Sequence, residues 1–295
     1  MPTIASILVP VITFILLATV GMDLTGQEFA RVRRQRTVVL AGLIAPLIVL
    51  PPLAVALVWV FKPPPDVEAG LFLVAACPIG GISNTYSYLA RASTALSVTL
   101  TGLSCLLASV TVPAVGRGLE LALARPLDLA APIPLLLAQL VLMLGVPVAL
   151  GMWVRRRSPR FAERHRPALQ RLGFAALAFV LLLVIADDPK GFAAGLSTTV
   201  PLAVAFVVCS TAAGWSVAVM VTRDRRDRFT LAAEFGTRNV AVATAIAVTL
   251  LGRVEFAKFG TTYFLTELPL MLAAIALFRA SESRRPVARV GEPQA

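Results

Sequence analysis

The chain has 295 residues, of which 58% are hydrophobic and only 15% are charged, and its formal net charge is +11. This composition is more apolar and less charged than that of an ordinary soluble domain, and it is typical of a membrane protein. The basic residues stand in short clusters between apolar runs, not on one solvated face. The sequence therefore argues against a nucleic-acid partner.

Few side chains are suited to catalysis or metal binding. The three cysteines lie inside apolar runs without the spacing of a metal site, and we interpret them as small buried hydrophobes. The single histidine, His165, lies in a basic cluster, so neither a metal centre nor a Ser-His-Asp site can be assembled. We therefore expect no enzyme activity, and no cofactor apart from a coupling ion.

Apolar runs of about 20 residues, the length that crosses a bilayer, fill most of the sequence. The first run, from Ile4, is too long for a signal-peptide core, and we expect it to be retained as a span. Together the runs predict an all-α membrane protein with nine segments, at 3–22, 38–61, 69–91, 94–116, 131–153, 171–187, 193–221, 229–251 and 260–279.

The basic clusters alternate between the two ends of these segments. Nineteen Lys and Arg residues lie around 31–36, 155–171, 223–228 and 279–289, whereas six lie in the turns at the opposite ends. Positively charged loops stay in the cytoplasm. We therefore expect a multi-pass protein of the cell inner (plasma) membrane, with its N-terminus outside and its C-terminus in the cytoplasm.

Two segments are interrupted by helix-breaking residues that have polar residues next to them. The stretch CPIGGISN, residues 77–84, interrupts segment 69–91, and Gly236 interrupts segment 229–251. Each interruption is either a kinked helix with close packing or a helix broken at mid-membrane, which is tolerated only where the open backbone is buried in protein or lines a polar cavity. Paired breaks in the two halves of a chain favour a secondary transporter built from inverted repeats.

Ionisable residues in these apolar segments require an explanation, because they are costly in a bilayer. On a continuous helix Glu234 and Arg238 would form a structural ion pair. Alternatively, Glu234 binds a cation and Arg238 meets an anionic substrate. Glu267, beside Pro269, is a proton site, a partner for Arg238 or a group at a helix end.

Hydroxyl residues follow one face of segment 94–116, where Ser97, Thr101 and Ser104 are spaced by four and three residues. Such hydroxyls commonly bond back to their own helix. A hard cation such as Na⁺, however, prefers oxygen ligands. A Na⁺ site could be supplied by Ser83, Asn84, Ser97, Thr101 and Glu234.

These motifs resemble those of the bile acid:sodium symporter family. CPIGGISNTYSYLARASTALSVTLTGLS, from Cys77, is similar to the family's first broken-helix signature, and EFGTRN, from Glu234, is similar to its Glu-x-Gly-x-Gln-Asn element. GMDLT and GLIAPLIVLP also match in place. The resemblance implies two crossed, broken helices, a core domain, a panel domain and a sodium site at the five residues above.

The family has nine or ten helices, and this chain would begin at the family's second helix, which agrees with nine. The resemblance assigns 1–36 and 118–192 to the panel domain, 37–117 and 193–280 to the core domain, and 281–295 to a cytoplasmic tail.

The family's second sodium site is changed in this chain. Two glutamines of that site correspond to Arg238 and Pro46. A guanidinium has no acceptor and stays charged, so we infer that Arg238 stands where a sodium ion stands in relatives. The substrate region also departs from the family, since Gly81 replaces a threonine. The substrate-binding residues that we expect are Gly81, Asn84, Arg238, Asn239 and Glu267.

The sequence thus predicts a symporter that carries a small organic anion with one Na⁺ by alternating access. One alternative is a transporter of the same fold that is coupled to protons through Glu234 or Glu267, or that is uncoupled. An alternative of another class is a membrane sensor that binds a ligand without transporting it.

Overall fold

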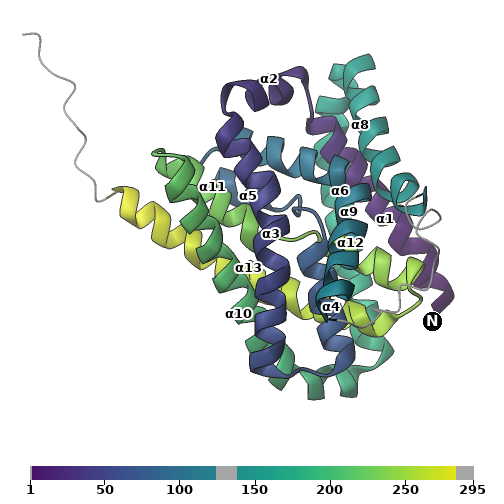
Figure 1. Cartoon of the computed structure of the whole chain (residues 1–295). Coiled ribbons are helices and arrows are strands. Elements are labelled where there is room, and N and C mark those ends of the chain that lie inside the picture. The colour runs from purple at the N-terminus through teal and green to yellow at the C-terminus, as the bar shows by residue number, and fades with distance from the viewer. Residues whose placement is uncertain (1, 124–137, 284–295) are drawn as a thin grey trace, which may run out of the picture.

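Helices make up nearly all of the computed structural model, which describes residues 2–123 and 138–283. In Figure 1 the helices run in chain order as α1 (Pro2–Asp23), α2 (Gly26–Arg34), α3 (Arg36–Phe61), α4 (Pro65–Ala76), α5 (Ser83–Leu89), α6 (Thr94–Leu123), the π-helix η1 (Val141–Gly145), α8 (Val146–Arg157), α9 (Pro159–Asp187), α10 (Pro189–Val221), α11 (Arg225–Gly236), α12 (Val240–Ala245), the π-helix η2 (Ile246–Leu250) and α13 (Val254–Ser283).

Long apolar helices dominate this part of the chain. Large apolar side chains such as Leu182, Met220 and Leu277 are exposed on them, as contact with lipid requires. The protein is therefore an all-helical, multi-span membrane protein, which confirms the predicted fold class. That it has nine membrane segments stays a prediction. Within the described residues, six helices are long and apolar enough to cross a membrane: Arg36–Phe61, Thr94–Glu120, Ala138–Arg157, Pro159–Asp187, Pro189–Val221 and Val254–Ser283.

Several expected boundaries need correction. The basic cluster 155–171 is not one loop, because α8 ends at Arg157 and α9 begins at Pro159. Proline suits the first position of a helix, and the Arg and Glu residues that follow are good helix formers. The last helix is longer than the predicted 260–279, and it takes in the first residues of the predicted tail. The start of segment 131–153 and the tail from 284 lie outside the described residues.

Helix α2 was not expected from the sequence. Its nine residues, GQEFARVRR, are polar and too short to span a bilayer. A search for apolar runs therefore passes over this helix, which connects α1 to α3.

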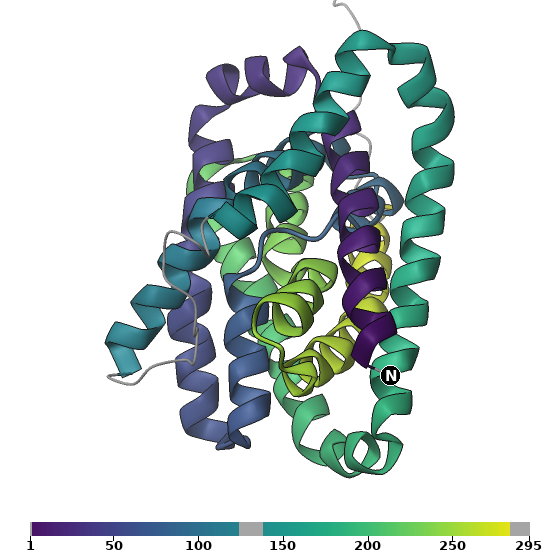
Figure 2. The same ribbon diagram turned by 90° about the vertical axis from the view of Figure 1, so that its right-hand side faces the viewer.

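The helices pack in two groups. Helix α1 packs mainly against α8 and α9, and we call these three helices the panel group. The core group consists of α3–α6 and α10–α13, in which α10 contacts α3, α11 and α13. Figure 2 shows α9 along one edge with α1 beside it, and α3 and α4 toward the opposite edge. The division into panel and core domains at the predicted boundaries stays a prediction.

Both interrupted segments are broken helices, not kinked ones. α4 ends at Ala76 and α5 begins at Ser83, while α11 ends at Gly236 and α12 begins at Val240. From Phe229 to Val248 every residue is buried, so the second broken helix lies at the centre of the molecule.

The two breaks cross and pair with each other. The Gly80 amide donates to the Thr237 carbonyl at 3.1 Å, and the Asn239 amide donates to the Pro78 carbonyl at 2.9 Å. Ile79 and Arg238 form an antiparallel β-bridge between them. The unwound backbone therefore finds partners inside the protein, which is the condition for breaking a helix within a membrane.

Gly80 is required at this crossing by close approach. A Cβ atom there would lie 2.8 Å from the Arg238 carbonyl oxygen, a backbone atom that cannot turn aside. We expect Gly80→Ala to destabilise the protein by about 1–3 kcal/mol, seen as a lower apparent Tm in detergent. Gly195→Ala in α10 is the matched control, because a Cβ there meets nothing within 4 Å. Equal Tm values for the two variants would contradict this account of the crossing.

Candidate functional site

The crossing is supported by polar groups from two further helices. From α6, the Ser104 hydroxyl accepts a bond from the Ile79 amide at 3.2 Å. From α13, the buried Tyr263 hydroxyl donates to the Gly236 carbonyl at 2.5 Å and accepts from the Arg238 amide at 2.8 Å. One phenol thus bridges the end of α11 to the extended residues that follow it.

Beside the crossing, the structure brings together all five residues predicted to bind a cation. The Ser83 and Thr101 hydroxyls donate to Glu234 Oε2 at 3.0 and 3.3 Å, and the Ser97 hydroxyl donates to Oε1. Asn84 joins through its Oδ1 atom, which accepts from Ser97 at 2.8 Å and from Thr101 at 3.3 Å. Four of the five residues are fully buried, and Asn84 is 7% exposed.

The hydroxyl face of α6 has two uses. Ser97 and Thr101 turn to the carboxylate, whereas Ser104 donates back to the Thr101 carbonyl at 3.0 Å, the ordinary behaviour of a hydroxyl in a membrane helix. The group at Glu234, which we call the oxygen cluster (Ser83, Asn84, Ser97, Thr101 and Glu234), offers one carboxylate, one amide oxygen and three hydroxyl oxygens. This donor set, with a single negative charge, fits a hard monovalent cation.

Arg238 does not form the helical ion pair with Glu234 that one sequence interpretation predicted. α11 ends at Gly236, so Arg238 lies in extended backbone and the four-residue spacing no longer brings the two side chains together. Among the described residues, the ion pairs include neither Glu234 nor Glu267 with Arg238. Arg238 is 3% exposed; its Nη2 donates to the Cys77 carbonyl, while Nε and Nη1 have no hydrogen-bond partner among the described residues.

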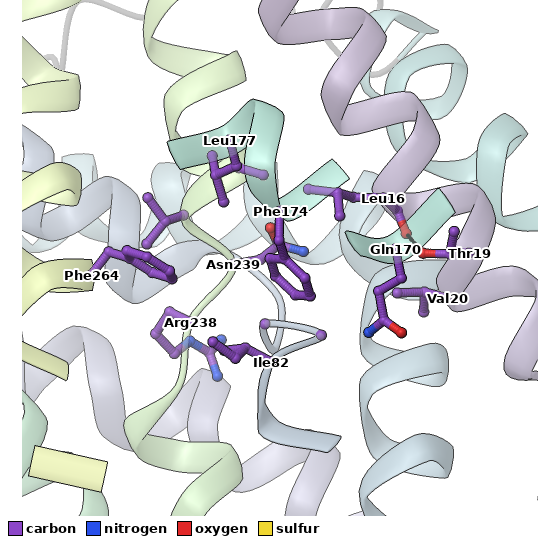
Figure 3. Close-up of a pocket in the computed structure, with 14 residues that line it drawn as sticks. Leu16, Thr19, Val20, Ile82, Gln170, Phe174, Leu177, Arg238, Asn239 and Phe264 are labelled. Carbon is purple, nitrogen blue, oxygen red and sulfur yellow. Dashed lines mark hydrogen bonds between the residues drawn. The ribbon is translucent and has the colours of Figure 1, made fainter. Parts of the chain in front are cut away.

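A narrow cavity lies between the crossing and the panel group. Gly81, Arg238 and Asn239 line it from the crossing, and Thr19 and Gln170 line it from α1 and α9. Figure 3 shows Thr19 and Gln170 on one side of this cavity and Arg238 on the other, with Asn239 and Phe174 between them. Of the residues expected to bind substrate, Gly81, Arg238 and Asn239 line this cavity.

Arg238 also lines a second cleft, on the side of α3 and α6. There it faces a wall that includes Pro46, Ser104 and Thr111. Pro46 and Arg238, the two positions at which the resemblance predicts a changed second sodium site, therefore line the same cleft.

Part of the Asn239 side chain is already hydrogen-bonded within the protein. Its Oδ1 atom caps α12 by accepting from the Val242 amide at 3.1 Å. The side chain also interacts with the Cys105 thiol. An amide nitrogen has two N–H donors, so one of them could still serve an anion.

The model of the sodium bile acid symporter family matches residues 9–194, more than half of the chain. The chain belongs to this family. It is therefore a member of a transporter family and not an enzyme. The matched range contains the first broken helix and the hydroxyls of α6, and it ends before the second broken helix.

Several known proteins are similar in sequence to this chain. YocS of Bacillus subtilis, by name a sodium-dependent transporter, is 35% identical over 99 residues, which are 34% of this chain and 31% of that protein. BASS2 of Oryza sativa chloroplasts, by name a sodium/metabolite cotransporter, is 32% identical over 149 residues, which are 50% of this chain and 34% of that protein. The chain spans about a third of the length of these two relatives. The P3 protein of Mus musculus is 25% identical over 73% of this chain and 46% of its own length.

Within this symporter-family site, Glu267 does not line the cavity at Arg238. It is fully buried on α13, where Oε1 accepts from the Thr237 hydroxyl at 3.1 Å and the carboxylate also interacts with the Tyr86 hydroxyl. Full burial excludes a group at a solvated helix end. The contact with Thr237 makes Glu267 a support for the residue beside Arg238, whereas the expected contact with substrate is not seen at this cavity.

Three residues of the site were missed by the sequence analysis: Tyr263, Gln170 and Thr19. Tyr263 is one of only three tyrosines in an apolar chain, and this rarity was the one available signal. Thr19 and Gln170 carried no local motif, because the panel helices bring them to the cavity only through folding.

The oxygen cluster yields a prediction for ion binding. We expect Na⁺ to raise the apparent Tm of the wild-type protein at constant ionic strength, with choline as the replacing cation, because a ligand that binds only the folded state stabilises it. Glu234→Gln should abolish this rise, since a neutral amide cannot offset the charge of the ion. Glu163→Gln, an exposed position on α9, should keep it. A sodium response that survives in Glu234→Gln would show that the cation binds elsewhere.

Proposed function

We propose that this family member is a secondary transporter of a small organic anion, coupled to one Na⁺, with Arg238 in place of a second sodium ion. The observation that carries the proposal is the buried guanidinium, which lies between two cavities and has two nitrogens without partners. A buried charge without hydrogen bonds is costly, so a ligand that supplies an anion here would be bound strongly.

The chemistry of the oxygen cluster supports Na⁺ as the coupling ion. The five residues of the cluster carry one net charge, that of Glu234, and they join both broken helices to α6. A cation bound there would hold α5 and α11 together and so stabilise the crossing that carries Arg238. Binding of the ion and binding of the anion would then favour each other.

The position of Arg238 supports a stoichiometry of one Na⁺ per transported anion. A unit charge fixed in the protein repels a second cation at short range, and the proline at position 46 offers no side-chain ligand at the same cleft. With one Na⁺ and one monovalent anion, the charges of cargo and coupling ion cancel. Glu234 and Arg238 likewise carry opposite charges when the carrier is empty.

The transport cycle that we propose moves the panel helices relative to the crossing. In the present conformation the Thr13 hydroxyl of α1 donates to the Ala241 carbonyl of α12 at 3.2 Å, on the side predicted to face outside. Breaking this contact would open the cavity to the exterior. The assignment of the N-terminus to the outside and the C-terminus to the cytoplasm of the inner membrane belongs to the same proposal.

Proton coupling is the second candidate function. It is favoured by Glu267, a fully buried carboxylate that faces two hydroxyl groups, those of Thr237 and Tyr86, and no basic side chain among the ion pairs of the described residues. A transporter of this kind would carry its anion without sodium and would lose its response to a pH gradient in Glu267→Gln.

Transport in proteoliposomes tests the function and the stoichiometry together. We expect an inward Na⁺ gradient to drive accumulation of a radiolabelled monocarboxylate, with a sodium Hill coefficient near 1 because one ion is bound. A membrane potential set by K⁺ and valinomycin should leave the uptake unchanged, since the cargo pair carries no net charge. Voltage-driven uptake would contradict the one-ion stoichiometry, and binding without flux would favour a sensor.

A substitution at Arg238 tests its role toward the anion. We expect Arg238→Gln to weaken monocarboxylate binding by about tenfold to a hundredfold, because hydrogen bonds to charged groups are worth about 1.5–3 kcal/mol. Isothermal titration at saturating Na⁺ would measure the change, with the exposed Arg160→Gln as control. Unchanged carboxylate affinity would remove Arg238 from the substrate site.

A further inference from the structure

The cavity at Arg238 has two polar ends that belong to different groups of helices. Arg238 and Asn239 come from the crossing, whereas Thr19 and Gln170 come from the panel helices α1 and α9. Figure 3 shows the two panel side chains next to each other, across the cavity from Arg238. The proposed function assigns a role only to the end at Arg238.

Gln170 is placed for contact with a ligand. It shares one face of α9 with Phe174 and Leu177, which follow at spacings of four and seven residues and line the same cavity. Its side chain is half-buried, and among the hydrogen bonds of the described residues its amide has none. An amide offers both a donor and an acceptor.

Thr19 limits what this end can bind. Its hydroxyl donates to the Leu16 carbonyl at 2.7 Å, so toward a ligand its oxygen can act only as an acceptor. An acceptor beside an amide suits an uncharged group that donates a hydrogen bond, and a hydroxyl fits best.

The walls between the two ends are apolar. They include Val20, Ile82, Phe174 and Phe264, and Arg238 is the one basic side chain among the described residues that line the cavity. A second carboxylate at the Gln170 end would therefore be desolvated without a cationic partner, at high cost. The lining fits a monoanion with an apolar middle and a neutral polar group at its far end.

We propose that Gln170, with Thr19, forms a second substrate subsite that binds a hydroxyl group of a monocarboxylate whose carboxylate is held by Arg238. This inference rests on the proposed function and adds the substrate class to it, a hydroxylated monocarboxylate. A substrate held at both ends links the panel group to the crossing. The hydroxyl group bound at the Gln170 end then determines which anions can hold the panel group against the crossing.

Matched pairs of acids test the subsite. The probes are butyrate with 4-hydroxybutyrate and hexanoate with 6-hydroxyhexanoate, titrated calorimetrically against the full-length protein at saturating Na⁺. One hydroxy acid should bind the wild type about threefold to tenfold more tightly than its parent, the gain of one neutral hydrogen bond. Gln170→Leu should remove this difference between each hydroxy acid and its parent. Gln139→Leu, an exposed position outside the cavity, should preserve it.

A gain of specificity provides an independent readout. Gln170→Arg places a second guanidinium at the far end, so adipate should bind this variant at least tenfold more tightly than it binds the wild type. If the acids bind in an Arg238-dependent manner while neither Gln170 variant changes their relative affinities, the subsite is overturned and the proposed function stands. If none of the acids binds at any sodium concentration, the subsite and the proposed function are both overturned.

Discussion

Backbone that unwinds in the middle of a membrane must find its hydrogen-bond partners within the protein, and here two broken helices provide them to each other. The pair of bonds between Gly80 and Thr237 and between Asn239 and Pro78 joins segments more than 150 residues apart in the chain. Every feature of the site depends on this pairing. It places Ser83 and Glu234 on neighbouring helix ends, and it turns Arg238 out of the helical register.

The break in α11 separates two charges that a continuous helix would have paired. Glu234, still helical, points into hydroxyl groups, whereas Arg238, now extended, reaches the cavity facing the panel group. A paired Glu–Arg bridge would have needed neither an ion nor a substrate. In the function that we propose, each separated charge binds a ligand of opposite sign, and the two ligands are coupled because they share the crossing. The coupling ion and the anion of this symporter family member would then have one common scaffold.

Much of this could be predicted from the sequence because membrane helices are long and apolar and their breaks are marked by Pro and Gly. The first break was visible in CPIGGISN, and the five residues of the oxygen cluster were named through the family resemblance and are found together. The pairing of Glu234 with Arg238 was wrong as a helical ion pair, because helical spacing does not hold across a break. Tyr263, Thr19 and Gln170 could not be assigned, since their roles arise only when α13, α1 and α9 pack around the crossing. Helix α2 was missed because it is polar and short.

We propose that the fixed guanidinium of Arg238 occupies the place of one of two sodium ions. Equilibrium binding of ²²Na⁺ to the purified protein, counted per chain at saturation in the wild type and in Glu234→Gln, tests this proposal. We expect one sodium ion per wild-type chain and none in Glu234→Gln. Two ions per wild-type chain would contradict it, because a second cation would then bind in spite of Arg238.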